Sequence, residues 1–225
     1  MNKNQVLLHT VFAIFCAFII QNRSFAEPQN LSLLKKEIQN YHDSGQYEKE
    51  LAQVVRQADH VIAQEVAMNA LRQHPKKLAI VLDIDETSLS NYPSIVRDDF
   101  TEDKEKVHRD LMAARGIVIQ PMKAFYEHVL SEGVSIFFVT GRYESIRAQT
   151  IKNLKSAGYH DWTALYLKPN DYHQASVIPY KSVARETITR KGYTIIASIG
   201  DQESDLKGGY ALHTFKLPNP YYYLP

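Results

Sequence analysis

The sequence predicts an α/β fold, a doubly wound parallel sheet with an N-terminal helical extension and a small helical insert after the first strand. Two patterns lead to this prediction. After Pro75, short segments that are apolar throughout alternate with helical segments, which is typical of a parallel sheet covered on both faces. Before Pro75, the apolar residues of 30–75 recur near a helical period. The 225 residues, of which 44% are hydrophobic, suffice for one domain with a buried core.

The elements are expected in the order helix, then strand and helix in alternation. Strands are expected at 78–82, 134–139 (VSIFFV), 163–167, 193–199 and 213–217. Helices are expected at 30–75, 101–114, 121–131, 144–157 and 179–190. Pro121 at the start of one helix and a glycine after three of them are typical helix boundaries. In such sheets, ligands bind beyond the carboxyl ends of the strands.

Residues 1–26 have the organisation of a cleaved signal peptide. Lys3 gives a positive start, 11–20 (VFAIFCAFII) is an apolar core, and 24–26 (SFA) places small residues where a signal peptidase cuts. We therefore expect an exported protein, periplasmic or secreted after cleavage, in which 27–225 form a single domain.

Two other interpretations of this segment are weaker. A membrane anchor would need about 20 apolar residues, and the uninterrupted run 11–20 is half as long. A lipoprotein cut at Cys16 would place the bulky Phe15 where a small residue is expected. Because Cys16 is the single cysteine of the chain, the mature protein would have no disulfide, and its stability would come from its core.

The charge balance of the chain argues against a polyanionic partner. The chain has 26 basic and 25 acidic residues, a formal net charge of +1. This balance offers no electrostatic case for binding nucleic acid or an anionic membrane surface. The motifs described next predict a small-molecule partner instead.

Polar side chains gather where the predicted strands end. The first strand leads into 83–87 (DIDET), the second into 140–142 (TGR), and the fourth into 200–205 (GDQESD). Lys181 lies at the start of the helix before that fourth strand. Each motif alone is weak evidence, since it also occurs on surface loops, turns and helix caps. Together, at the carboxyl edge of one sheet, they predict a single site.

The residue types of this site predict its chemistry. Carboxylates from two strand ends form the kind of all-oxygen site that Mg²⁺ occupies, and the cation would offset the repulsion between them. The hydroxyl, the glycine amides and the lysine are donors suited to the spread negative charge of a phosphoryl group.

These motifs resemble those of the haloacid dehalogenase superfamily. The segments DIDET (83–87), VTGR (139–142), PYKS (179–182) and IGDQESD (199–205) are similar to its four motifs. DIDETSLSNYP and GDQESDL resemble its acid phosphatase branch more closely, which includes class C bacterial acid phosphatases and plant vegetative storage proteins. The likeness covers roughly 30–220, and it implies a Rossmann-like core and a Mg²⁺-dependent acid phosphatase.

The resemblance assigns roles to individual residues. Asp83 would be the nucleophile that attacks phosphorus, and Asp85 the general acid and base. Thr140 and the amide of Gly141 would bind the phosphoryl oxygens, and Lys181 would neutralise charge on Asp83 and the phosphate. The predicted metal site comprises Asp83, Asp85 through its backbone carbonyl, Asp201 and Asp205.

The spacing of the two aspartates fits these roles. Alternate residues of an extended segment point the same way, so Asp83 and Asp85 can flank one phosphorus atom. On the same reasoning, Glu86 is expected to point away, as a solvated or helix-facing charge. Thr87 and Arg142 are expected to support the site without contacting the substrate.

Three rival functions are considered. A two-component receiver domain also has acids, Thr and Lys, but its phosphorylated Asp lies on a later strand than its acidic pair. A phosphotransferase or phosphomutase would need a larger cap to exclude water than the segment between Thr87 and Thr140 offers. A catalytically weak or inactive storage or binding protein of the same fold is the main alternative.

The sequence names only the class of substrate, a small phosphomonoester with nucleotides among the candidates. Tyr92 and Tyr172 could stack on a base, or could simply pack within the fold. The oligomeric state is left open.

Overall fold

The computed structural model describes residues 27–224, and the signal peptide expected over 1–26 lies outside them. The chain divides between Leu34 and Lys35 into two units, and the description below concerns the larger one, Lys35–Pro225. Within the described part of the chain, no helix combines the length and the apolarity needed to cross a membrane.

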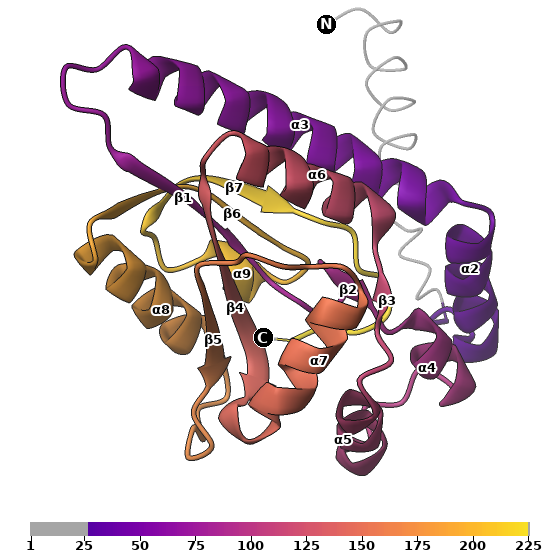
Figure 1. The fold of residues 1–225 in the computed structure, drawn as a ribbon. Helices are drawn as coiled ribbons and strands as arrows, with labels where there is room; N and C mark the ends of the chain where they lie inside the picture. Colours follow the sequence, from indigo (N-terminus) through magenta and orange to yellow (C-terminus); the bar gives the residue numbers. More distant parts are fainter. Residues whose placement is uncertain (1–26, 225) are drawn as a thin grey trace, which may run out of the picture. The chain divides into compact units, whose positions relative to one another are not determined.

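The predicted parallel sheet is present and has five strands (Figure 1). Its strands are β1 (Lys77–Leu82), β4 (Ser135–Tyr143), β5 (Ala164–Lys168), β6 (Tyr193–Gly200) and β7 (Ala211–Lys216). They lie in the order β5-β4-β1-β6-β7, and every neighbouring pair is parallel. The central β1 thus has β4 on one side and β6 on the other, so three motif-bearing strand ends are neighbours.

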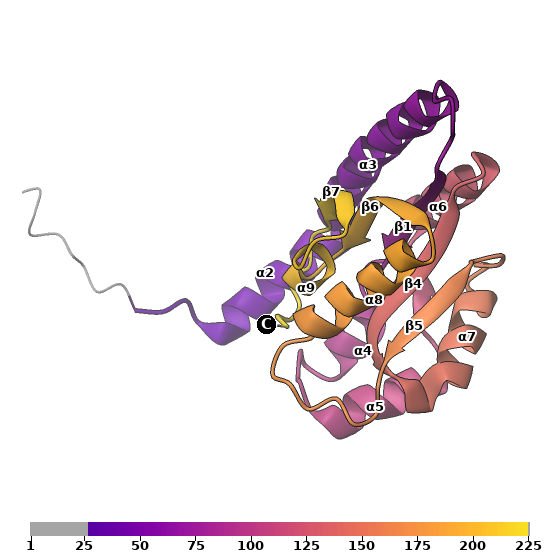
Figure 2. The ribbon, with the colours of Figure 1, turned by 90° about the vertical axis from the view of Figure 1, so that its left-hand side faces the viewer.

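Alternate residues of β1 show that both faces of the sheet are covered. Ile80 and Leu82 belong to an apolar cluster with α3 and α6, whereas Ala79 and Val81 belong to a second cluster with α8. These helices are α3 (Gln46–Ala70), α6 (Gln120–Ser131) and α8 (Ile178–Arg190). α3 and α6 lie together on one face and α8 lies on the other (Figure 2). The continuous apolar run of β1 therefore reflects burial on both sides, as expected of a doubly wound sheet.

The insert after β1 is small, as predicted, but it has more elements than the single helix expected at 101–114. It contains β2 (Leu89–Ser90), α4 (Tyr92–Arg97), α5 (Lys104–Ala113) and β3 (Ile117–Val118). β2 and β3 form a two-stranded antiparallel ribbon. Asp103 caps α5, since its side chain accepts hydrogen bonds from the amides of Glu105 and Lys106.

Two helical predictions need correction at their boundaries. The helix expected over 30–75 is broken into α2 (Leu31–Asp43) and α3, because Gly45 adopts a left-handed φ of 81° between them. The helix expected over 144–157 begins with a 3₁₀ turn (Glu144–Ile146) before α7 (Arg147–Ser156). A short helix, α9 (Glu203–Leu206), follows β6 and was not expected.

Candidate active site

The first motif forms a tight loop at the end of β1. The amides of Ser88 and Leu89 both donate to the carbonyl of Ile84, at 2.9 and 2.8 Å. Ser88 Oγ donates to the carbonyl of Asp83 at 2.8 Å, and the Asp83 amide donates to the carbonyl of Ile199 in β6 at 3.0 Å. Asp83 is therefore held firmly where β1 and β6 end side by side.

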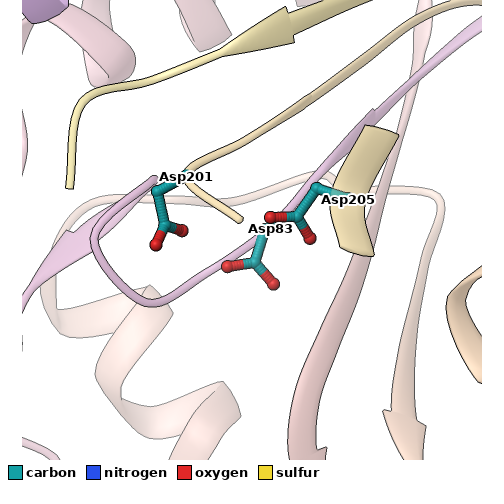
Figure 3. Close-up of side chains that lie close together, drawn as sticks. All are labelled: Asp83, Asp201 and Asp205. Atoms are coloured by element: carbon teal, nitrogen blue, oxygen red, sulfur yellow. The ribbon is translucent and has the colours of Figure 1, made fainter. Parts of the chain in front are cut away.

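Three of the predicted acids meet at this edge (Figure 3). Asp83 follows β1, Asp201 follows β6, and Asp205 lies on α9. All three are buried, and one carboxylate oxygen of each lies within 4.8 Å of those of the other two. Burial and the charge of Asp205 raise the pKa of Asp83 well above its ordinary value, because like charges in a poorly solvated place disfavour ionisation.

Lys181 provides positive charge among these carboxylates. It lies in the first turn of α8, is 4% exposed, and donates from Nζ to Asp83 Oδ1 at 2.8 Å and to Asp205 Oδ1. Burial alone would lower the pKa of Lys181, but Asp205 and Asp83 together raise it above its ordinary value. The ammonium group therefore stays charged and favours the ionised form of Asp83.

Gly200 makes the close approach of Asp205 possible. A Cβ atom on Gly200 would lie 2.2 Å from Asp205 Cγ, far inside van der Waals contact. The Asp205 carboxylate is further fixed by the Gln202 amide, which donates to Oδ2 at 2.9 Å. The glycine of the GDQESD motif is thus required by packing against the carboxylate.

Asp201 is oriented by hydrogen bonds rather than by an ion pair. Thr87 Oγ1 donates to its Oδ1 at 2.9 Å, so Thr87 contacts one of the predicted metal ligands. Side-chain amides of Gln202 and Asn219 donate to its Oδ2, each at 2.7 Å. Burial and Asp205 raise the pKa of Asp201, while these two amides lower it.

The donor set of this cluster fits a divalent metal ion. Asp83, Asp201 and Asp205 supply carboxylate oxygens from separate elements, and Lys181 offsets only part of their charge. Hard cations such as Mg²⁺ prefer oxygen ligands of this kind. Burial and neighbouring carboxylates raise the pKa values of Asp83 and Asp201 and so disfavour their ionised forms. A cation bound here would favour those ionised forms again.

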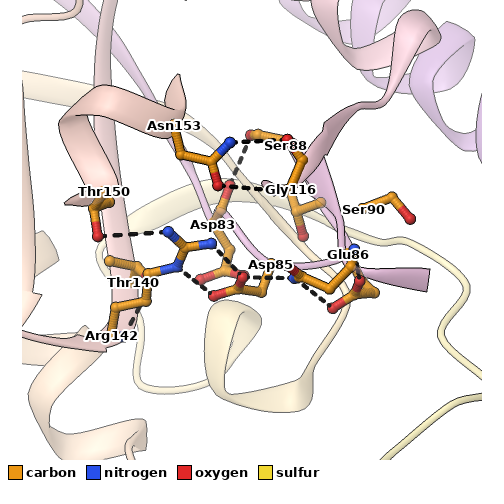
Figure 4. A network of polar contacts seen from close by, with 12 residues as sticks. Asp83, Asp85, Glu86, Ser88, Ser90, Gly116, Thr140, Arg142, Thr150 and Asn153 are labelled. Carbon is orange, nitrogen blue, oxygen red and sulfur yellow. Dashed lines mark hydrogen bonds and ion pairs between the residues drawn. The ribbon is translucent and has the colours of Figure 1, made fainter. Parts of the chain in front are cut away.

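Asp85 has a different environment from that of the other three acids (Figure 4). Arg142 reaches it from β4, donating from Nη2 to Oδ1 at 2.7 Å and from Nε to Oδ2 at 2.9 Å. Asn91 Nδ2 also donates to Oδ1 at 2.8 Å. Burial would raise the pKa of Asp85, but Arg142 and Asn91 outweigh it and hold that pKa below its ordinary value. Arg142 thus contacts the predicted general acid directly.

The expectation for Glu86 was wrong. Its side chain is 1% exposed, and its φ of 51° ends the extended segment on which the prediction relied. The Asn91 amide donates to Oε1 and Tyr222 Oη donates to Oε2, both at 2.6 Å. Burial, followed by the charge of Asp85, raises the pKa of Glu86 to about 8. Glu86 is therefore part of the buried network and is not a surface charge.

The second motif lies within β4, which runs on to Tyr143 instead of ending at residue 139 as predicted. Thr140 is fully buried, and its Oγ1 accepts a hydrogen bond from the Arg142 amide at 3.2 Å. A Cβ atom on Gly141 would meet no atom within 4 Å. The space next to the Gly141 Cα is therefore free of protein atoms.

The backbone around Asp205 and after α9 is held by a residue that was not singled out from the sequence. Arg185 lies one turn after Lys181 on α8 and is fully buried. Its guanidinium donates to the carbonyls of Gly209 at 2.9 Å, Asp205 at 3.0 Å, and Lys207. The same buried face of α8 thus holds both the side chain and the backbone of Asp205.

The two tyrosines considered for substrate contact have partners within the chain. Tyr92 stacks on His42, with ring centroids 3.4 Å apart, and donates to Asp43 at 2.9 Å. Tyr172 donates to the carbonyl of Ser176 at 2.6 Å and packs edge-on against Tyr180. These contacts support the packing interpretation of both rings.

Asn91, Asn219 and Tyr222 also contact acids of the site, and no role was assigned to them from the sequence. Asn91 follows DIDETSLS and could have been suspected from its closeness to the first motif. Asn219 and Tyr222 lie in the last few residues of the chain, and no spacing rule connects them to Asp201 or Glu86.

Comparison with known families gives one match that spans most of the chain. The model of the HAD superfamily, subfamily IIIB (acid phosphatase), matches residues 17–225. Among solved structures, the class C acid phosphatase from Bacillus anthracis is similar to this chain with a TM-score of 0.66 and 20% sequence identity. That match covers 85% of this chain and 86% of the other. At this identity, the likeness shows the shared fold.

Curated plant proteins are more similar in sequence. Acid phosphatase 1 of Solanum lycopersicum is 39% identical over 153 residues, which are 64% of this chain and 58% of that protein. The stem 28 kDa glycoprotein of Glycine max is 40% identical over 161 residues, 68% of this chain and 63% of that protein. Vegetative storage protein 1 of Arabidopsis thaliana is 40% identical over 100 residues, 44% of this chain and 37% of that protein. The matched region thus spans less than two thirds of these relatives.

Proposed function

The chain belongs to the acid phosphatases of subfamily IIIB of the HAD superfamily, and on that premise we propose that it is an exported, Mg²⁺-dependent phosphomonoesterase. The observation that carries this proposal is the buried group formed by Asp83, Lys181, Asp201 and Asp205. It joins a carboxylate nucleophile, a fixed cation and an all-oxygen donor set at the carboxyl edge of the sheet. Small phosphomonoesters, nucleotides among them, are the proposed substrates.

Mg²⁺ would be held by Asp83, Asp201 and Asp205, with the backbone carbonyl of Asp85 as the further predicted ligand. When bound, the ion supplies positive charge that stabilises the phosphoryl group and keeps Asp83 ionised. Lys181 contributes charge of the same sign from the protein itself. Thr140 and the Gly141 amide are proposed to hold the phosphoryl oxygens.

The proposed reaction has two steps at phosphorus. In the first, a carboxylate oxygen of Asp83 attacks, the bond to the ester oxygen breaks, and Asp85 donates its proton to the departing alcohol. In the second, water attacks the aspartyl phosphate, Asp85 takes a proton from that water, and phosphate leaves with Asp83 regenerated. Asp85 is thereby returned to its protonated form.

An acidic optimum is part of the proposal. The first step needs a proton on Asp85, while Arg142 and Asn91 favour its ionised form. Acidic medium increases the protonated fraction, and the ionisation of Asp83 sets the lower limit.

A storage protein of the same fold is the alternative function, since two of the matched relatives are named vegetative storage proteins. Asp83 is present here, and its hydrogen bond with Lys181 at 2.8 Å keeps the nucleophile paired with its cation. This observation favours an active enzyme over an inactive store.

The test separates the two aspartates. Asp83→Ala should abolish turnover of every phosphate ester. Asp85→Ala should slow an alkyl phosphate by about 10²- to 10⁴-fold, the usual worth of general acid catalysis. With p-nitrophenyl phosphate, whose leaving group needs no proton, it should give a burst of nitrophenol near one equivalent and then a slow rate. The protein mass should rise by one phosphoryl group.

The control is Asp161→Asn, an exposed aspartate before the amino-terminal end of β5, which should keep wild-type activity. Full activity in the presence of a chelator would remove Mg²⁺ from the proposal. A phosphoenzyme that still forms in Asp83→Ala would move the nucleophile to another residue, and an inactive wild type would favour the storage function.

A further inference from the structure

The C-terminal tail, defined here as residues 217–224, lies against the ends of β6 and of the first motif. The Leu217 amide donates to the carbonyl of Gly200 at 2.9 Å, directly before Asp201. Leu217 is fully buried and Tyr221 is 7% exposed. The tail is thus packed into the fold on both sides of Asn219.

The local sequence fixes the position of Asn219. Pro218 and Pro220 flank it, and proline restricts both its own φ and the backbone of the residue before it. Asn219 Oδ1 accepts a hydrogen bond from the Tyr221 amide at 2.8 Å. With the oxygen of the amide so engaged, Nδ2 faces Asp201 and donates to Oδ2 at 2.7 Å.

A second amide is held by the tail in the same way. Gln202 Oε1 accepts a hydrogen bond from the Leu224 amide at 3.1 Å, and Gln202 Nε2 donates to Asp201 Oδ2 at 2.7 Å. Two amide nitrogens, each fixed through its own oxygen by the tail backbone, therefore converge on one carboxylate oxygen. Together with Thr87 on Oδ1, they set the rotation of the Asp201 carboxylate.

We propose that Asn219 is a positioning residue of the metal site, which turns the Asp201 carboxylate toward Asp83 and Asp205. This inference rests on the proposed Mg²⁺ site and adds the C-terminal tail to it. The three donors occupy three of the roughly four lone-pair sites of the Asp201 carboxylate and orient it, which leaves one site on Oδ1 for a cation. Losing such an outer partner typically weakens metal binding by about 10- to 100-fold.

The alternative is that Asn219 only shapes the tail, and two variants separate these roles. Asn219→Ala removes both the donor to Asp201 and the acceptor for the Tyr221 amide. Asn219→Ser keeps an oxygen that can accept from that amide, but it is too short to reach Asp201. If Asn219 acts on Asp201, both variants lose Mg²⁺ affinity, whereas a purely structural role would be rescued by serine.

The matched control is Asn69, whose side-chain amide also makes one hydrogen bond through its nitrogen and one through its oxygen, in this case both to the backbone. Its Nδ2 donates to the Lys76 carbonyl at 3.0 Å and its Oδ1 accepts from the Lys76 amide at 2.9 Å, before the start of β1. Asn69→Ala removes the same kind of contact at the opposite edge of the sheet, so it should leave Mg²⁺ binding unchanged.

The experiment is a titration of the full chain with MgCl₂. Binding is measured by calorimetry and, independently, by the Mg²⁺-induced rise in melting temperature. We expect the Mg²⁺ dissociation constant to rise about 10- to 100-fold in Asn219→Ala and Asn219→Ser, and to stay within about threefold of wild type in Asn69→Ala. Wild-type affinity in Asn219→Ser would overturn the inference while leaving the proposed function intact. A wild type that binds no Mg²⁺ would overturn the metal site itself and the inference with it.

Discussion

Glu86→Gln should change how the stability of the metal-free protein depends on pH. In the folded chain the pKa of Glu86 is raised from its ordinary value of 4.5 to about 8, first by burial and then by Asp85. The folded state therefore holds a proton that the unfolded state releases between these two pH values. By linkage, the free energy of unfolding must fall as pH rises through this window.

The size of the effect follows from the two pKa values. One pKa unit corresponds to about 1.4 kcal/mol, so the wild type should lose up to roughly 5 kcal/mol from Glu86 alone between pH 4.5 and pH 8. Glutamine is uncharged, like a protonated glutamate: its carbonyl oxygen can accept from the Asn91 amide, and its NH₂ group can donate to Tyr222 Oη, which reverses the present bond to Oε2. Its variant should be close to wild type at pH 5 and more stable at pH 8.

The assay is denaturant unfolding in chelator at several pH values from 5 to 8.5. Asp83 and Asp201 also have raised pKa values, but they contribute to both proteins and drop out of the difference. Exposed Glu102 provides the control, since Glu102→Gln should leave the pH dependence of wild type intact. If wild type and Glu86→Gln lose stability in parallel, Glu86 is ionised in the folded protein and the reasoning fails.

Two further predictions concern neighbouring parts of the site. Gly200→Ala should force Asp205 away, because its Cβ would lie 2.2 Å from Asp205 Cγ, and Mg²⁺ binding measured by calorimetry should weaken at least tenfold. Gly192→Ala is the control, because a Cβ on Gly192 would meet no atom within 4 Å although the φ of Gly192 is 89°. This variant should be less stable than wild type but keep its Mg²⁺ affinity. Arg142→Gln should raise the pKa of Asp85, because it removes the guanidinium that favours the ionised carboxylate. The high-pH limb of the kcat/KM profile for an alkyl phosphate should then shift to higher pH. An unmoved limb would mean that Asp85 is not the group that titrates there.

The sheet and the meeting of the motifs were predictable because they follow from long-range rules. Apolar runs such as 78–82 indicate strands buried on both faces, and parallel strands bring their carboxyl ends to one edge. Asp83, Lys181 and Asp205 are distant in sequence, yet their positions after strands and at a helix start predict that they are neighbours, and their side chains are hydrogen-bonded.

The missed features depend on local backbone geometry and on contacts without a pattern. Glu86 points inward because its φ is 51°, and nothing in DIDET indicates where the extended segment ends. Asn219 reaches Asp201 only because the tail packs beside β6, a matter of tertiary structure. The short α4 and α9 fall below the length at which a helical period can be recognised.

The energetics of the buried charges bear on the choice between an enzyme and a storage protein. Asp83, Asp205 and Lys181 are each at most 5% exposed, and buried ion pairs often stabilise a fold less than apolar residues of similar volume would. A protein that served only as a store would gain nothing from holding a third carboxylate, Asp201, beside this pair. Oriented carboxylates that repel one another until a cation binds are what phosphoryl transfer requires. The cost of this arrangement therefore supports the proposed phosphatase over the storage protein.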